Sequence, residues 1–133
     1  MKKIIILFTL FGLLSCSENS ENKNTNPELK AKLIGTWENE GYYDDVANPD
    51  TPDGFYPIPN GISTTYTNET FNSTLSGNPH ESGTYTISSD SLLSHNNELI
   101  GKIYLLDNSK LIITIPSGYG AIRYNQINDN EYL

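Results

Sequence analysis

The sequence predicts an all-β domain that folds as a small up-and-down antiparallel β-barrel of about eight short strands. Short stretches in which apolar and polar residues alternate recur from residue 33 to residue 127, as half-buried strands require. Segments rich in Gly, Asn, Asp and Ser separate these stretches, and tight turns can join only antiparallel neighbours. No segment suits a crossover helix, and closing the sheet is the usual way to remove its two exposed edges.

The length and charge of the chain limit both its core and its partners. With 133 residues the chain can build one domain around one modest core. Its formal charge is −8, and removal of an N-terminal segment that holds Lys2 and Lys3 leaves six basic and sixteen acidic residues, or −10. An acidic surface repels nucleic acid and anionic headgroups, so we expect neither as a direct partner. A single cysteine excludes an intramolecular disulfide.

Residues 1–15 read as a lipoprotein signal peptide. A positive start precedes an apolar run over residues 4–14, which is too short to span a bilayer and suits a secretory signal. The run ends in Leu13-Leu14-Ser15-Cys16, which resembles the lipobox of bacterial lipoproteins. The resemblance implies cleavage before Cys16 and lipidation of its thiol, with palmitate among the acyl chains. The alternative is an ordinary signal peptide followed by an unrelated cysteine.

Residues 16–28 are expected to form the lipidated cysteine and a flexible tether, ahead of a domain over residues 29–133. Residues 17–27 (SENSENKNTNP) contain almost nothing apolar and cannot offset the entropy of ordering. No aspartate follows Cys16, which by resemblance to Gram-negative lipoproteins implies the outer membrane rather than the inner one. We therefore expect a lipid-anchored protein of the outer membrane.

The first strand is predicted over residues 33–39, after one possible helical turn at residues 28–33. Leu33, Gly35 and Trp37 fall at alternate positions, so in a strand they share one face. Gly35 would let another backbone or ring approach closely. We expect Trp37, the single tryptophan, to lie in the core.

Seven more strands are predicted from alternation and turn signals. Their ranges are 62–66, 70–75, 83–87, 91–94, 99–106, 110–115 and 121–127. The segment 76–79 (SGNP) is predicted as a turn. Ile62, Thr64 and Tyr66 are expected to share one face of their strand, and Phe71, Ser73 and Leu75 one face of theirs. The side chains expected to face the core are Tyr85, Ile87, Leu111, Ile113 and Ile115.

Four segments together resemble the lipocalin-like domains of small Gram-negative bacterial lipoproteins. They are Leu33-x-Gly35-x-Trp37, residues 82–87 (SGTYTI), residues 106–113 (LDNSKLII) and Arg123-Tyr124. The resemblance implies a lipocalin-like barrel that binds small apolar ligands inside. It also implies that Arg123 stacks on Trp37, since first and last strands become neighbours when the sheet closes. The chain is shorter than a full lipocalin, and its first connection is enlarged.

That connection, residues 41–61, is the unusual surface element. Tyr42, Tyr43, Phe55 and Tyr56 flank several aspartates, including Asp44. Three interpretations remain open: a loop that caps the barrel, recognition of a ligand or partner by the four aromatic rings, and calcium binding by the carboxylates. The spacing of the aspartates is not that of an EF-hand loop.

The chain shows no motif for catalysis or for a resident metal. His80 and His95 fall in predicted turns, without histidine or cysteine at ligand spacing, and no nucleophile elbow is present. We therefore expect neither an enzyme nor a cofactor. The leading function is binding of a small apolar or amphipathic molecule, in the barrel or under residues 41–61. The alternative is a filled barrel that serves as an interaction module for an envelope protein or glycan.

Overall fold

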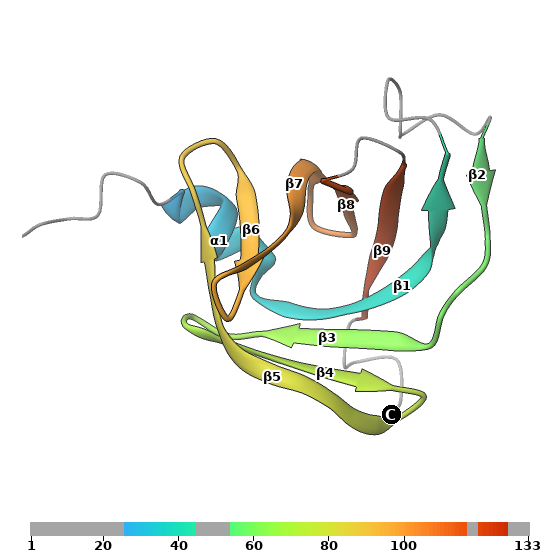
Figure 1. Cartoon of the computed structure of the whole chain (residues 1–133), viewed down its shortest axis with the longest axis horizontal. Coiled ribbons are helices and arrows are strands. Elements are labelled where there is room, and N and C mark those ends of the chain that lie inside the picture. The colour runs from blue at the N-terminus through green and yellow to red at the C-terminus, as the bar shows by residue number, and fades with distance from the viewer. Residues whose placement is uncertain (1–25, 45–53, 117–119, 128–133) are drawn as a thin grey trace, which may run out of the picture.

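The computed structural model describes residues 26–44, 54–116 and 120–127, and Figure 1 shows their arrangement. The elements are the helix α1 (Pro27–Leu33) and the strands β1 (Gly35–Tyr43), β2 (Phe55–Tyr56), β3 (Ile62–Tyr66), β4 (Thr70–Leu75), β5 (Asn78–Ile87), β6 (Leu92–His95), β7 (Glu98–Leu106), β8 (Lys110–Thr114) and β9 (Ala121–Ile127). All pairings between these strands are antiparallel. The predicted all-β, antiparallel class is confirmed.

The sheet returns on itself through its first long strand. From β3 to β9 each strand pairs with the next one along the chain. β1 pairs with β3 along one edge and with β9 along the other, so first and last long strands are neighbours, as the sequence predicts. Figure 1 shows β1 and β9 side by side. The two-residue strand β2 extends the sheet beside the far end of β1.

Helix α1 covers one end of this sheet. Asn26 caps it, because the side-chain oxygen Oδ1 accepts a hydrogen bond from the Leu29 backbone N–H at 3.1 Å, and Pro27 occupies the first turn, where no N–H is needed. Leu33 is fully buried, and its carbonyl accepts a hydrogen bond from the Trp37 indole N–H at 2.8 Å. Leu33 therefore belongs to the helix, and the first strand begins at Gly35 rather than at residue 33.

The interior near α1 is filled by side chains. The main core consists of Leu33, Trp37, Tyr66, Phe71, Tyr85, Ile87, Leu93, Ile103, Leu106, Leu111 and Ile113. Phe71 stacks on the imidazole of His95 with 3.8 Å between ring centroids. Tyr66 also holds the His95 ring, since its hydroxyl lies 2.9 Å from Nε2 in a buried hydrogen bond. His95 is thus a core residue of β6, and its predicted place in a turn is wrong.

A β-bulge at Glu40 divides β1 into two halves. Odd-numbered side chains point inward in the first half, and even-numbered ones point inward in the second. Asn39 lies opposite Tyr124 of β9, but the next registered pair is Gly41 with Arg123, so Glu40 is an extra residue. Tyr42 consequently lies opposite Ile122, which pairs with the core residue Ile113 on the inner face. Side chains beyond the bulge have therefore exchanged faces.

On the outer face, beyond the bulge, a second apolar cluster forms. Tyr43 and Ala121 lie opposite each other and pack with Ile112 of β8, all three buried. Phe55 and Leu105 add partly buried apolar surface. We call these five residues the outer cluster. It is a product of the bulge, because unbroken alternation would have turned Tyr43 inward.

Three other predictions differ from the structure. Residues 41–61 are not wholly a loop, because β1 continues to Tyr43 and pairs with β2. The predicted turn at 76–79 is shorter: Ser76 and Gly77, with φ of 50° and 80°, make the turn, and β5 starts at Asn78. His80 therefore lies in β5 rather than in a turn.

Two findings concern the ends of the described chain. Within residues 26–44, 54–116 and 120–127 no helix has the length and apolar character needed to cross a membrane. The predicted signal peptide, Cys16 and most of the tether lie outside the described residues.

Candidate functional site

An apolar recess opens at the end of the sheet opposite α1. Its volume is about 270 Å³. The residues that line it are Asn39, Gly41, Tyr42, Ile58, Asn60, Ile115 and Ile122. Most of the surface they offer is hydrocarbon, with amide groups at two positions. The recess therefore has the composition of a site for an apolar or amphipathic molecule.

The bulge at Glu40 explains how this recess forms. It turns Tyr42 inward, opposite Ile122, which already faces inward on the unbroken strand β9, at the end where the main core no longer fills the interior. Along β1, residues 39 to 41 separate the stretch that pairs with β3 from the stretch that pairs with β2. Here Asn39 bridges the gap, since its Oδ1 accepts a hydrogen bond from the Asn60 backbone N–H at 3.1 Å. Asn39 is 4% exposed, so its amide is a fixed part of the wall.

The four aromatic residues predicted to bind a ligand are brought together as two cross-strand pairs. Tyr42 stacks on Tyr56, with ring centroids 5.1 Å apart and the rings inclined by 17°. Tyr43 packs on Phe55 at 5.0 Å, on the other face of the same two strands. The first pair is open to solvent, at 40% and 42% exposure. Tyr43 is 2% exposed and offers no surface to a ligand.

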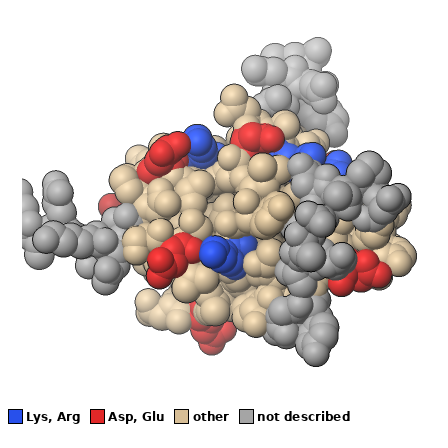
Figure 2. Space-filling model, turned by 90° about the horizontal axis from the view of Figure 1, so that it is seen from above, with Lys and Arg blue, Asp and Glu red and all other residues tan. Residues whose placement is uncertain are grey.

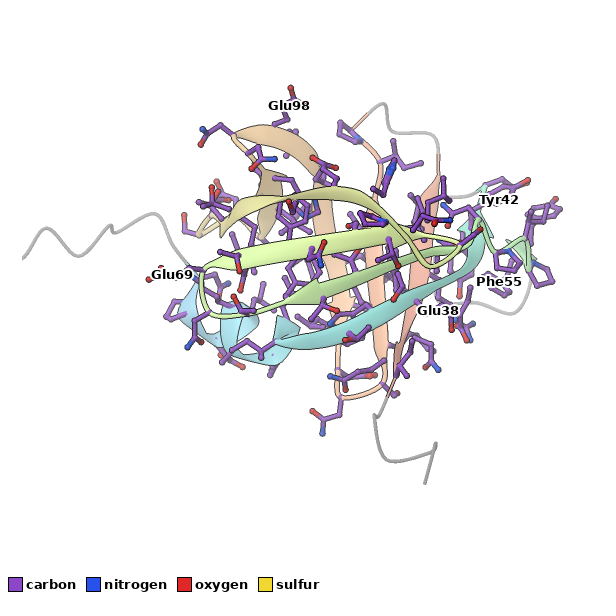
Figure 3. The ribbon with its side chains drawn as sticks, turned by 90° about the horizontal axis from the view of Figure 1, so that it is seen from below. Glu38, Tyr42, Phe55, Glu69 and Glu98 are labelled. Carbon is purple, nitrogen blue, oxygen red and sulfur yellow. The ribbon has the colours of Figure 1, made fainter. Side chains whose placement is uncertain are left out.

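Tyr42 and Tyr56 form a ledge beside the recess. The Tyr56 hydroxyl donates a hydrogen bond to Oδ2 of Asp44 at 3.1 Å, and this bond raises the pKa of Tyr56. Ile58, exposed to 60%, follows Tyr56 along the chain and lines the recess itself. Figure 3 shows Tyr42 and Phe55 together at the end of the molecule away from α1. The ledge and the recess thus form one continuous site.

Arg123 does not stack on Trp37, and that prediction is wrong. Its guanidinium carbon lies 4.6 Å from the ring centroid of Phe55, on the outer face. Its Nε donates to Oε2 of Glu40 at 2.6 Å, and Nη1 donates to the Tyr43 hydroxyl at 3.5 Å. The register explains the difference, because β9 places Gln126 opposite Trp37 and Arg123 opposite Gly41.

Gly35 and Trp37, the other two signature residues, lie at the end near α1. Trp37 is fully buried, as predicted. Gly35 has φ of 135°, and a Cβ there would stand 2.6 Å from the Gln126 side-chain nitrogen. The group that approaches Gly35 is therefore the end of the Gln126 side chain, and not the backbone or ring that the sequence predicts for this position.

Charged side chains are mixed over the surface that Figure 2 presents. Acidic and basic groups lie among one another there rather than gathering into one basic patch. Among the described residues no group of three or more His, Cys, Asp or Glu side chains is placed to hold a metal ion. The aspartates considered for calcium are described only at Asp44, since residues 45–53 lie outside the described ranges.

The sequence predicted two of the seven residues that line the recess. Tyr42 was among the predicted ligand-binding residues, and Ile115 was predicted to face inward. Ile58, Asn60 and Ile122 come from separate segments that only the closed sheet brings together. Ile122 lies two residues before Tyr124 in the same strand, so period-two alternation could have indicated that both face inward. Nothing in the sequence indicates Ile58.

Comparisons of the chain with protein-family models, with curated proteins and with solved structures found no match in any of the three. The functional argument therefore depends on the chain's own residues and geometry.

Proposed function

We propose that this protein is a lipid-anchored lipoprotein of the outer membrane, and that its closed sheet is a lipocalin-like barrel which binds a small apolar or amphipathic molecule without chemical turnover. The recess carries the proposal. Binding sites for small molecules are concave and mostly apolar, with a few polar groups that orient the ligand. Tyr42, Ile58, Ile115 and Ile122 supply the apolar walls, while the side-chain oxygens of Asn39 and Asn60 are engaged by backbone N–H groups.

The size of the recess narrows the ligand. Its volume of about 270 Å³ falls at the low end of the range for small-molecule sites, roughly 300–1,000 Å³. A compact ligand would fill it, or a larger molecule would insert one apolar group and leave the remainder outside. The exposed rings of Tyr42 and Tyr56 are placed to receive that remainder.

The lipocalin-like part of the proposal has separate support. The Gly35-x-Trp37 motif opens β1, and the indole of Trp37 is fully buried beside the helix. The pairing of β1 with β9 is the closure that such a barrel needs.

Filling the recess tests its role directly. The probe is the environment-sensitive dye 8-anilinonaphthalene-1-sulfonate, whose fluorescence rises in apolar sites. Ile115→Trp and Ile122→Trp should each weaken dye binding at least tenfold, because the larger side chain occupies the space. Leu99→Trp on β7, where Leu99 is 48% exposed and outside the recess, is the matched control.

Two outcomes decide the matter. Dye affinity that stays unchanged in both filled variants, with unchanged circular dichroism, would contradict a binding recess. Native mass spectrometry of protein purified from its own host should then show whether a bound mass accompanies the wild-type chain and is missing from the filled variants.

The second candidate is a glycan-binding module. The observation that favours it is the exposed, stacked pair of Tyr42 and Tyr56, because aromatic faces pack well on the apolar faces of sugar rings. Tyr56→Ala removes half of this ledge without touching the lining of the recess. Loss of saccharide binding in Tyr56→Ala, together with full binding in Ile115→Trp, would favour the glycan module over the apolar site.

A further inference from the structure

We propose that the recess faces away from the membrane that anchors the chain, so that the protein takes its ligand from the aqueous compartment and not from its own lipid leaflet. This inference rests on the proposed lipid anchor at Cys16. It follows from the positions of α1 and the recess, and from the length of chain between Cys16 and α1.

The first step is the attachment of the tether to one end of the domain. The Asn26 backbone N–H donates to the Ile87 carbonyl at 3.0 Å, and Leu29 packs against the main core. Leu33 is fully buried and is bonded to Trp37 through its carbonyl. The chain therefore leaves the folded domain at the α1 end, in a fixed place.

The second step is the distance from this end to the recess. From Gly35 to Tyr42 β1 advances seven residues, or about 23 Å at about 3.3 Å per residue. Ile115 and Ile122 line the recess at the same far end. Figure 1 places α1 at the end opposite β2, and Figure 3, seen from another direction, places Tyr42 at the end away from the helix.

The third step is the reach of the tether. Ten peptide units connect Cys16 to Asn26, and whatever their conformation they span at most about 35 Å. If the recess faced the bilayer, the domain would be inverted and the chain would have to run back along at least the length of β1. That path consumes most of the reach and forces residues into extended conformations, which costs entropy at each one. With the recess facing outward the tether has no such constraint.

This orientation specifies how the ligand arrives. The ledge of Tyr42 and Tyr56 and the side chain of Ile58 are presented to the solvent on the outward side. A ligand reached in this way is an amphipathic molecule with enough solubility to cross water, or one displayed on a surface that faces the anchor membrane. A lipid drawn from the anchor's own leaflet does not fit.

Energy transfer to a membrane-surface acceptor tests the orientation without any ligand. The mature lipidated chain has no free thiol, so a single donor dye can be placed at Ala31→Cys on the exposed side of α1 or at Leu75→Cys beside the far end of β3. Each labelled protein is bound to vesicles of phosphatidylethanolamine and phosphatidylglycerol that carry an acceptor dye on the headgroup. Transfer from position 31 should exceed transfer from position 75, because the register places Leu75 about four residues, or about 13 Å, further along β1 than Gly35.

Equal transfer, or greater transfer from position 75, would overturn the proposal. A tether lengthened by thirty Gly and Ser residues after Thr25 is the matched control, and it should abolish the difference because the domain can then invert freely. These results do not depend on ligand binding, so they can fail while the dye-binding experiment succeeds, and the reverse. A chain shown by mass to lack lipid would remove the premise and overturn the proposal on that separate ground.

Discussion

Arg123 lies over the ring of Phe55, with 4.6 Å between the guanidinium carbon and the ring centroid. The contact connects the last strand of the sheet to β2, across β1. Phe55 pairs with Tyr43, and the next pair along the same two strands is Tyr42 with Tyr56. The contact therefore holds β2 in place, and β2 carries Tyr56, one of the two rings of the ledge. Glu40 keeps the guanidinium in position through its ion pair.

The energy of this contact can be measured by a double-mutant cycle with Arg123→Met and Phe55→Leu. A cation over an aromatic face contributes about 0.5–2 kcal/mol, so the coupling energy in urea unfolding should fall in that range. The same cycle with Lys102→Met in place of Arg123→Met is the control, since Lys102 is exposed on β7. A coupling no larger than that of the control would show that the two residues merely lie close together.

Stability should fall as the pH drops from 6.5 to 4, because of His95. Burial lowers the pKa of His95 from 6.5 to about 4. Between these values the unfolded chain binds a proton that the folded chain does not, so the free energy of unfolding decreases as the pH falls. The contribution is complete above pH 6.5 and lost below pH 4, and it amounts to about 3 kcal/mol.

Chemical denaturation at several pH values checks this, with His95→Gln beside the wild type. Glutamine retains a hydrogen-bonding group for Tyr66 but does not titrate, so the difference between the two proteins isolates His95 from the carboxylates. His80→Gln is the matched control for the replacement of a histidine, because His80 is exposed on β5. A slope in His95→Gln as steep as in the wild type would refute the assignment.

Gly41→Ala should detach β2 from β1. A Cβ at Gly41 would overlap the Tyr56 carbonyl oxygen and stand 3.0 Å from Phe55 Cζ and from Pro57 Cα. Because backbone blocks the added methyl group, the substitution should cost about 2–3 kcal/mol and weaken dye binding.

Gly77→Ala is the matched control, because it introduces backbone strain without a steric overlap of the added methyl group. Gly77 has φ of 80°, but nothing lies within 4 Å of its Cβ position, so alanine should cost about 1 kcal/mol and leave dye binding intact. Thermal unfolding and dye titration of both variants give the comparison. Equal effects on dye binding would show that β2 has no part in the site.

Cys16→Ser should release the protein from the membrane fraction. The thiol is the group that carries the proposed lipid, and serine cannot form the thioether. Mass spectrometry of the wild-type chain should show an N-terminal Cys16 with acyl mass, and the variant should show none. A Cys16→Ser protein that still carries lipid and stays with the membrane would exclude this anchor.

The alternation of apolar and polar residues and the turn residues between these stretches predicted the strands well, because both signals are local in the sequence. The segments 62–66, 70–75 and 121–127 were predicted with the bounds that the structure has. The pairing of first and last long strands followed from closure of the sheet. The register of that pairing could not be predicted, because closure of the sheet does not determine which residue of β1 lies opposite Arg123.

Bulges explain most of what the sequence could not show. Period-two alternation assumes an unbroken ladder, whereas the register shifts at Glu40 and again between Ile103 and Leu105. The second shift places Leu106 in the main core together with Ile103, whereas plain alternation would put these two residues on opposite faces. His95 was missed for another reason, because its stacking on Phe71 joins strands that are distant in sequence.

The single extra residue at Glu40 also separates the charge of the site from its shape. Removing it would join Asn39 directly to Gly41 and keep each registered pair between β1 and β9, so that Tyr42 would still face the recess and Tyr43 the outer cluster. The half of β1 that contains Trp37 would keep its place in the main core. A deletion would instead remove the carboxylate that holds the Arg123 guanidinium beside Phe55, so that one lost residue would loosen β2 without exchanging the side chains that meet the ligand.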